Sequence, residues 1–315
     1  MTGKRKEFRY IIRLDGGLGN QMFQYAHARY LVSLYGGQIM LDTGSFKEQM
    51  EYVSPLSHFA LSGKPAETMA TAPVFAKLAV LKAKVFKRLG LLTESNYTRM
   101  ARMGIVNQAR TEYYDFLLSP TRTYNYIYGN WMSHKFFGDI GGILKKEFQI
   151  ITPPSEANAR MLARIASAES PVCVHIRRGD YCSDKWASKL LVCDYEYYKD
   201  AVDYIRKTVP SPTFFVFSNT HDDLDWIKQN YHFEGDIEYV DLSNPDYEEL
   251  RLMAACKHFI LSNSTFSWWA QFLCTYPEKV VAAPRIWNNG AWNVSDLIMD
   301  EWHLVDNAES RIEKR

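Results

Sequence analysis

Two segments of the sequence place polar and charged side chains directly after short apolar runs. In Val174–Tyr181 (VHIRRGDY) the polar members are His175, Arg177, Arg178 and Asp180. Guanidinium groups bind phosphate oxygens bidentately and stay charged, so this pattern is typical of an anion site. Because side chains alternate across a strand, we expect Arg177 and Arg178 to point in different directions, with His175 on the side of Arg177. We predict that Arg177 faces a pyrophosphate, while Arg178 pairs with Asp180 and holds the loop.

The second segment, His258–Leu273 (HFILSNSTFSWWAQFL), runs from an apolar strand into Ser262, Asn263, Ser264 and Thr265. These residue types cap helices, and capping alone would account for them. A helix start also presents free N–H groups and the positive end of the helix dipole, which bind phosphate. Together with the arginine segment, it is predicted to hold a diphosphate from a second side.

A glycine loop follows the first predicted strand and comprises Gly16, Gly17, Gly19, Asn20 and Gln21. Glycines allow the backbone to approach a ligand closely, and the two amides would contact it. The loop is not a dinucleotide fingerprint, because the GxGxxG spacing requires glycine where Met22 stands.

Two acidic pairs have alternative interpretations. Asp223 and Asp225 form a DxD, a pattern that binds metal in one architecture of glycosyltransferase, but here it falls in the first turn of a predicted helix, where the dipole favours acids. We therefore expect no metal site. Glu248 and Glu249 are either solvated acids at a helix start, or a carboxylate that accepts hydrogen bonds from N1 and the 2-amino group of guanine.

Strands and helices alternate along the second half of the chain. Strands are predicted at 172–177, 214–217, 237–240, 259–261 and 280–283, and helices at 195–207, 222–229, 247–256 and 266–274. The first half opens with a strand at 9–14, a helix at 21–35 and a strand at 38–41, and a further helix is predicted at 133–148. This alternation predicts parallel sheets covered on both faces, with ligands beyond the carboxyl ends of the strands. Two prolines near position 153 mark the boundary between domains 1–152 and 153–315.

Composition excludes several classes of protein. A net charge of +1 gives no electrostatic case for nucleic acid binding. Five cysteines without a CxxC pair argue against a zinc site or a disulfide framework and favour a reducing compartment. The apolar part of the N-terminus is too short for a signal peptide, so we expect a cytoplasmic protein.

Residues 73–92 carry five basic residues and no acid. Phe75, Leu78, Val85 and Leu89 would share one face of a helix. The stretch is either a helix lying on an anionic membrane surface or a solvated helix packed on its own domain.

In this order, the segments GGLGNQMFQYA, HIRRGDY, CDYEYY and LMAACKHFILSNSTFSWWAQFL resemble the bacterial α-1,2-fucosyltransferases of glycosyltransferase family 11, over roughly residues 10–285. The resemblance implies an α/β fold of the GT-B type: two Rossmann-like domains facing across a cleft, with 1–152 on the acceptor side and 153–315 binding GDP-fucose. It implies inverting, metal-independent transfer of L-fucose to the 2-hydroxyl of a galactose-type acceptor, either an oligosaccharide or a lipid-linked glycan such as an O-antigen intermediate.

By position, the resemblance assigns Arg177 to the diphosphate, His175 to the vicinity of the nucleotide, and Ser264 and Thr265 to phosphate contacts. Glu249 stands where relatives usually have Asp for guanine, so its side chain is one carbon longer. The expected donor site comprises His175, Arg177, Arg178, Glu249, Asn263, Ser264 and Thr265, with Arg177 and Asp180 as catalytic residues.

Two questions stay open at this level. The general base is Asp15, His27 or Asp180, or no base is needed because the transition state resembles an oxocarbenium ion. Two other classes of protein fit the same residues: a transferase of another sugar or linkage on the same scaffold, and a non-catalytic protein that binds GDP-sugars or glycans.

Overall fold

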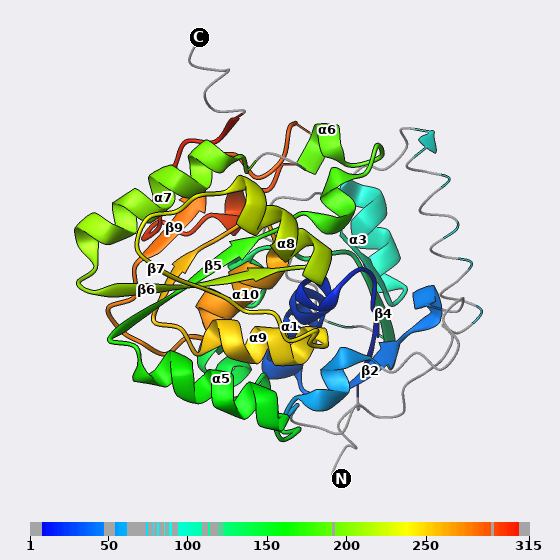
Figure 1. The fold of residues 1–315 in the computed structure, drawn as a ribbon. Coiled ribbons are helices and arrows are strands. Elements are labelled where there is room, and N and C mark those ends of the chain that lie inside the picture. Colours follow the sequence, from blue (N-terminus) through cyan, green and yellow to red (C-terminus); the bar gives the residue numbers. More distant parts are fainter. Residues whose placement is uncertain are drawn as a thin grey trace. The chain divides into compact units, whose positions relative to one another are not determined.

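The computed structural model describes residues 8–46, 54–61, 94–108, 122–190, 193–290 and 293–308, with single residues at 74, 78, 81, 85, 88, 89, 113 and 120. The chain divides into two compact units, Met1–Ile151 and Thr152–Arg315. Each unit contains one sheet whose paired strands all run parallel, with helices packed against it (Figure 1). The predicted α/β class, with Rossmann-like units as in GT-B glycosyltransferases, is confirmed. In the described part of the chain, no helix has the length and apolar character needed to span a membrane.

The first unit has a four-stranded sheet in the order β2-β1-β4-β3. Its strands are β1 (Arg9–Arg13), β2 (Gln38–Asp42), β3 (Ile105–Asn107) and β4 (Tyr124–Tyr128). Helix α1 (Leu18–Tyr35) follows the glycine loop and is buried from Leu18 to Ala28 except at Asn20. An apolar helix enclosed in this way fixes the position of the loop that precedes it.

The helix predicted at 133–148 is wrong in its first half. Short 3-10 turns at His134–Phe136 and Gly138–Ile140 precede α4 (Gly141–Glu147), and α3 (Glu94–Arg102) lies earlier in the unit. Gly138 has a φ of 49°, a left-handed conformation that interrupts a regular helix.

The second unit has a six-stranded sheet in the order β10-β9-β8-β5-β6-β7. Its strands are β5 (Ser170–Ile176), β6 (Pro212–Ser218), β7 (Asp236–Tyr239), β8 (His258–Ile260), β9 (Val281–Pro284) and β10 (His303–Val305). The chain begins at the centre with β5, moves outward through β6 and β7, and then adds β8, β9 and β10 on the other side. The order therefore reverses between β5 and β8, and a reversal of this kind is where open parallel sheets bind ligands.

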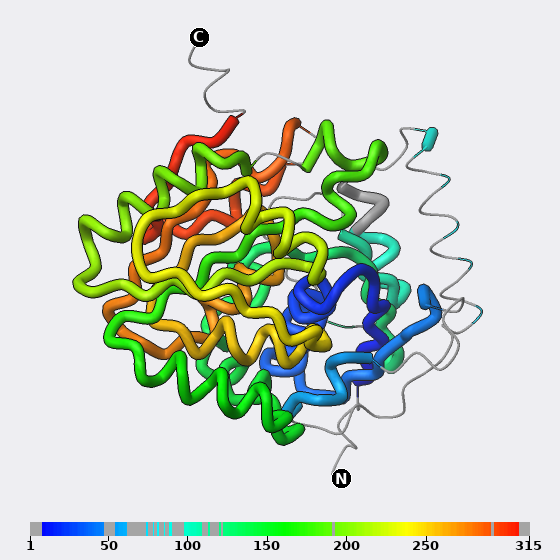
Figure 2. Tube along the Cα trace, viewed as in Figure 1, coloured from blue at the N-terminus to red at the C-terminus, as the bar shows by residue number. Residues whose placement is uncertain are grey.

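The helices of this unit are α5 (Glu156–Ser167), α6 (Ala187–Leu190), α7 (Tyr195–Thr208), α8 (His221–Asn230), α9 (Asp246–Ala254) and α10 (Thr265–Leu273). Their succession along the chain can be followed by colour in Figure 2. The four helices and five strands predicted here are confirmed, with bounds that differ by at most two residues. Helices α5 and α6 and strand β10 were not predicted.

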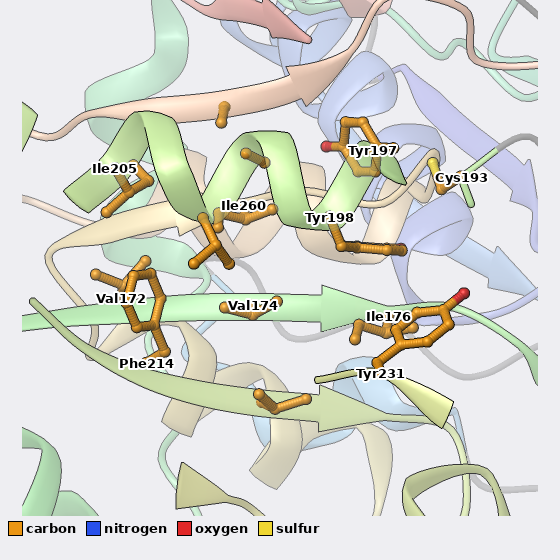
Figure 3. Close-up of a cluster of buried hydrophobic side chains, with 14 of the residues drawn as sticks. Val172, Val174, Ile176, Cys193, Tyr197, Tyr198, Ile205, Phe214, Tyr231 and Ile260 are labelled. Atoms are coloured by element: carbon orange, nitrogen blue, oxygen red, sulfur yellow. The ribbon is translucent and has the colours of Figure 1, made fainter. Parts of the chain in front are cut away.

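Strand β5 is buried along its whole length. Val172, Val174 and Ile176 pack beneath α7, where they meet Tyr198 and Ile205 (Figure 3). Burial of each such aliphatic side chain contributes about 1.5–3 kcal/mol. Because side chains alternate, the residue between Val174 and Ile176 faces the other side of the sheet.

Candidate functional site

That intervening residue is His175, and it joins the two strands at which the sheet order reverses. It is buried, and its Nδ1 lies 2.8 Å from Oγ of Ser262, two residues beyond the end of β8. Burial, assisted by the charge of Arg177, lowers the pKa of His175 to about 3, so the ring is neutral at physiological pH. Its role in the structure is to fix the spacing of the two loops.

Arg177 follows β5 and lies against its own turn. Its Nη2 donates to Oδ1 of Asp180 at 2.7 Å, and its Cζ lies 5.2 Å from the ring centroid of Tyr181. The side chain is 27% exposed, so a ligand can reach it, and its buried Nε has no hydrogen-bond partner. The Tyr181 hydroxyl donates to the carbonyl of Asn263 at 3.1 Å, which connects this turn to the serine loop, residues 262–264 between β8 and α10.

The predicted pairing of Arg178 with Asp180 is wrong. Asp180 lies in a 3-10 turn, Gly179–Cys182. This turn places its carboxylate beside Arg177, three residues earlier in the chain. Arg178 points toward α8, where its Cζ lies 3.3 Å from the ring centroid of Trp226. The expectation that the two arginines face different directions is confirmed.

The serine loop ends at the start of α10. Ser264 is its N-cap, and its Oγ accepts a hydrogen bond from the Phe266 N–H at 3.2 Å, so the capping interpretation is confirmed. Thr265, half-buried, is the first residue of the helix. No acidic residue lies in the first turn of this fully described helix, which leaves the positive end of its dipole available to an anion.

Asn263, which the sequence places in the donor site, organises the loop. The side chain is buried, and Nδ2 donates to the carbonyls of Leu190 and Trp287, both at 2.8 Å. A buried amide committed to two carbonyls holds three chain segments together.

Glu248 and Glu249 are not solvated acids at a helix start, which was one of the two interpretations of this pair. Glu248 is buried, and its Oε1 lies 3.1 Å from Nη2 of Arg251, which also donates to the Thr152 carbonyl. Glu249 is half-buried, and its Oε2 accepts from Nδ2 of Asn244 at 3.4 Å. Burial raises the pKa of Glu249 to about 7.

Asp223 and Asp225 lie in the first half of α8, and their carboxylates have different partners. Asp225 accepts from Nζ of Lys228 at 2.9 Å. Ligand atoms of His221, Asp225 and Asp241 lie within 4.8 Å of one another, a spacing that suits a cation. The Lys228 ammonium supplies positive charge to the same carboxylates.

The glycine loop of the first unit is held by side chains from α1. Gly16 has a φ of 75°, and a Cβ there would lie 2.5 Å from Nδ2 of Asn20. Nε2 of Gln21 donates to the Gly16 carbonyl at 3.0 Å, and Oε1 of Gln21 accepts from Oγ of Ser54 at 3.2 Å. Gln21, which is buried, therefore supports the loop instead of supplying the predicted ligand contact.

Gln24 is a loop-holding residue that the sequence did not single out. Its Oε1 accepts from the Asp15 N–H at 3.0 Å, and its Nε2 donates to the Asp15 carbonyl at 3.2 Å. Gly17 is the N-cap of α1, with no atom within 4 Å of where a Cβ would lie, whereas Gly19 is buried in the first turn. The backbone at Gly17 is thus accessible to a ligand.

The candidates for general base differ in environment. His27 is buried, stacks on Trp131 at 3.8 Å between ring centroids, and has Nδ1 bound to the Phe136 carbonyl. Burial lowers the pKa of His27 to about 4, so it is a core residue and a poor base. Asp15 is exposed and accepts from the Gly16 N–H, whereas Asp180 is engaged with Arg177.

The structure thus brings the Arg177 turn and the start of α10 together at the reversal point of a Rossmann-like sheet. A family model described as glycosyl transferase family 11 matches residues 1–305. The chain belongs to glycosyl transferase family 11. Membership confirms the resemblance and the predicted class of enzyme, a glycosyltransferase.

The names of similar proteins point to two different sugars. The chain is 28% identical to an alpha-1,2-colitosyltransferase of Escherichia coli, over 94% of this chain and 98% of that protein. It is 26% identical to galactoside alpha-(1,2)-fucosyltransferase 1 of Oryctolagus cuniculus, over 84% of this chain and 64% of that protein. Among solved structures, NodZ alpha-1,6-fucosyltransferase soaked with GDP-fucose aligns with a TM-score of 0.49 at 15% identity, over 85% of this chain and 93% of that one.

Proposed function

We propose that this enzyme transfers L-fucose from GDP-fucose to the 2-hydroxyl of a galactose-type acceptor, with inversion and without a metal. The observation that carries the proposal is the pairing of the Arg177 turn with the start of α10 at the reversal point of the sheet. The His175–Ser262 contact and the hydrogen bond from Tyr181 to the Asn263 carbonyl connect the two. The family and the names of its relatives support the type of sugar and the linkage.

In this reaction the acceptor oxygen attacks the anomeric carbon, and the bond from that carbon to the diphosphate oxygen breaks. GDP leaves with the bonding electrons, and the acceptor hydroxyl gives up its proton to a base or to solvent water. Negative charge grows on the β-phosphate, so groups aimed at that phosphate lower the barrier. Arg177 supplies a partly exposed guanidinium, and α10 supplies N–H groups and the positive end of its dipole.

We assign recognition of guanine to Glu249. A carboxylate can accept hydrogen bonds from N1 and the 2-amino group together, which adenine does not offer. Glu249 is half-buried and bound by Asn244 alone among the hydrogen bonds that the structure gives it. Its neighbour Glu248 is buried and paired with Arg251, so it is less accessible to a base.

We place the acceptor on residues 1–152, with the glycine loop at Gly17 as a backbone contact, and GDP-fucose on residues 153–315. The direct test is incubation of the purified enzyme with GDP-fucose and galactose-terminated oligosaccharides, followed by linkage analysis of the product. An α-1,2-linked fucose supports the proposal. Binding of GDP-fucose with neither transfer nor hydrolysis would favour a non-catalytic binding protein.

Colitosyl transfer is a second candidate, favoured by the similarity to the Escherichia coli colitosyltransferase. Colitose is L-fucose without the 3-hydroxyl group. The GDP derivatives of both sugars carry the same diphosphate, so both suit the diphosphate clamp formed by Arg177 and the start of α10. A panel of GDP-fucose, GDP-colitose and GDP-mannose separates the candidates by kcat/KM. Preference for GDP-colitose would replace fucose in the proposal and leave the clamp unchanged.

We further propose that residues 73–92 contact an anionic membrane that carries a lipid-linked acceptor. Five apolar side chains at helical spacing are exposed there: Val74, Leu78, Leu81, Val85 and Leu89. Phe75, assigned to this face from the sequence, lies outside the described residues. Basic residues and no acids lie between them in the sequence, which matches a negatively charged surface.

Flotation with vesicles of phosphatidylglycerol and phosphatidylcholine tests this contact. Leu78→Ser together with Leu81→Ser should abolish flotation, and zwitterionic vesicles should bind the wild type more weakly. Unchanged flotation of the double variant, or no flotation of the wild type, would rule out a membrane role for this stretch.

A further inference from the structure

Arg178 and Arg177 are adjacent in the chain, yet they serve different parts of the molecule. The Arg178 guanidinium lies on the ring of Trp226, with 3.3 Å between Cζ and the ring centroid, and its Nε is 3.6 Å from Oδ1 of Asp223. Both charged side chains are mostly buried, at 18% and 16% exposure. A cation held by a ring and a carboxylate in a largely desolvated position resists displacement.

The backbone of the same turn is also held from α8 and the loop before it. The Arg178 N–H donates to Oδ1 of Asn219 at 3.1 Å, and the Gly179 N–H lies 3.3 Å from Oδ2 of Asp223. Gly179 has a φ of 39°, and a Cβ there would lie 3.2 Å from Cγ of Asn219. Two successive N–H groups of an unusual turn are therefore satisfied by side chains from the next strand–helix connection.

Capping of α8 alone does not account for Asp223. Thr220 is the N-cap and accepts from the Asp223 N–H at 3.1 Å, and its hydroxyl donates to Oδ2 of Asp223 at 2.9 Å. The carboxylate nevertheless extends beyond its own helix to Gly179 and Arg178. Asp225 lies two residues further along the same helix. Its carboxylate accepts from Lys228 and, in the described part of the chain, makes no such contact with the arginine turn.

We propose that Asp223 and Trp226 are positioning residues for the reaction: they lock Arg178 and Gly179 so that Arg177 stays aimed at the diphosphate. This inference rests on the proposed function, because it requires Arg177 to stabilise the leaving group. It gives the Asp-x-Asp sequence a structural purpose, in which one aspartate holds the arginine turn. Misplacement of a catalytic group by about 1 Å can cost up to ~100-fold in rate, so the lock should matter for kcat.

Asp223→Asn keeps the shape of the side chain and removes its charge, and Asp225→Asn is the matched control. We expect kcat to fall by about tenfold or more in Asp223→Asn, with a smaller change in the KM for the sugar nucleotide, and Asp225→Asn to stay within about twofold of wild type. Trp226→Phe retains a ring and should keep most of the activity, whereas Trp226→Leu should lose about as much as Asp223→Asn. Equal kcat values for Asp223→Asn and Asp225→Asn would overturn the inference.

A double-mutant cycle distinguishes positioning from general destabilisation. If Asp223 acts through Arg177, Asp223→Asn should cause little further loss of kcat in an Arg177→Ala background, because the group being positioned is absent. Additive losses would mean that Asp223 merely supports the fold and would overturn the inference. Melting curves of each variant identify those that fail to fold, and for these Trp226→Leu in the same cycle takes the place of Asp223→Asn. Failure of the proposed function would be distinct, since wild type would then transfer no sugar from GDP-fucose or GDP-colitose.

Discussion

The Arg177 guanidinium is held by the Asp180 carboxylate of its own turn, with 2.7 Å between Nη2 and Oδ1. The pair is accessible rather than buried, since Asp180 is 57% exposed. A surface pair of this kind contributes little to stability, so its value lies in orienting the guanidinium. Nη2 of Arg177 is thus bound to Asp180, while its buried Nε has no hydrogen-bond partner.

Replacement of Arg177 by lysine tests the need for the planar guanidinium. Lysine retains the charge but loses bidentate hydrogen bonding, so kcat should fall by more than about tenfold. Steady-state kinetics with GDP-fucose measure this, with Arg206→Lys, a surface arginine paired with Glu234, as the control. Near wild-type turnover of Arg177→Lys would rule out the assigned role.

Binding of the sugar nucleotide should depend on pH through Glu249. Its carboxyl has a pKa of about 7 because burial, with Asp241 and Asp246 nearby, disfavours the charged form. Only the ionised form accepts from guanine, so affinity should be full above pH 8 and fall as pH drops through 7, by about tenfold by pH 6. Titration of GDP by calorimetry from pH 6 to 8.5 measures the change.

Glu249→Gln should bind GDP weakly at every pH and show no such slope, whereas the surface variant Glu234→Gln should behave as wild type. The raised pKa also has a consequence for stability, which is greatest where the carboxyl is protonated and declines as pH rises through 7. Glu249→Gln should therefore melt at a higher temperature than wild type at pH 8 and at nearly the same temperature at pH 4. An unchanged pH slope in this variant would show that another group controls binding.

Removal of the Ser262 hydroxyl should weaken the connection between β5 and β8. In Ser262→Ala the buried Nδ1 of His175 loses its partner, which costs about 1–3 kcal/mol of unfolding free energy. Urea denaturation measures this loss, and Ser33→Ala, which removes an exposed hydroxyl, should have no effect beyond about 0.5 kcal/mol. Equal stability of the two variants would mean that the His175–Ser262 contact is unimportant.

Chelation should not affect transfer. The charge of the leaving group is assigned to Arg177 and α10, so activity in excess EDTA should stay within about twofold of that in Mg²⁺ or Mn²⁺. If EDTA does lower the activity, the group formed by His221, Asp225 and Asp241 is the candidate metal site. Loss of activity in EDTA that Mn²⁺ restores would contradict the metal-independent step.

The parallel sheet of the second unit was predictable because its strands are short apolar runs separated by amphipathic helices. The position of β5 followed from Val172 to Ile176, and the start of α10 from the cap at Ser264. The reversal of strand order between β5 and β8 was not predictable, because spatial order depends on long-range pairing that no local pattern encodes. That reversal is what brings the two predicted motifs to one place.

Side-chain partners were less predictable than elements. Proximity in sequence suggested Arg178 with Asp180, but the 3-10 turn brings Asp180 to Arg177, and Arg178 finds Trp226 from a different element. Gln21 was expected to face a ligand, yet its side-chain amide donates a hydrogen bond to the nearby Gly16 carbonyl. Such partners depend on the three-dimensional course of the loops, which residue types alone do not specify.

Calorimetric titration of GDP and GMP against wild type and Arg177→Ala tests the diphosphate clamp most directly. If Arg177 binds the β-phosphate, wild type should bind GDP at least about tenfold more tightly than GMP, and Arg177→Ala should lose most of that difference while binding GMP as before. Equal weakening of GDP and GMP in Arg177→Ala, or an unchanged preference for GDP, would contradict the account.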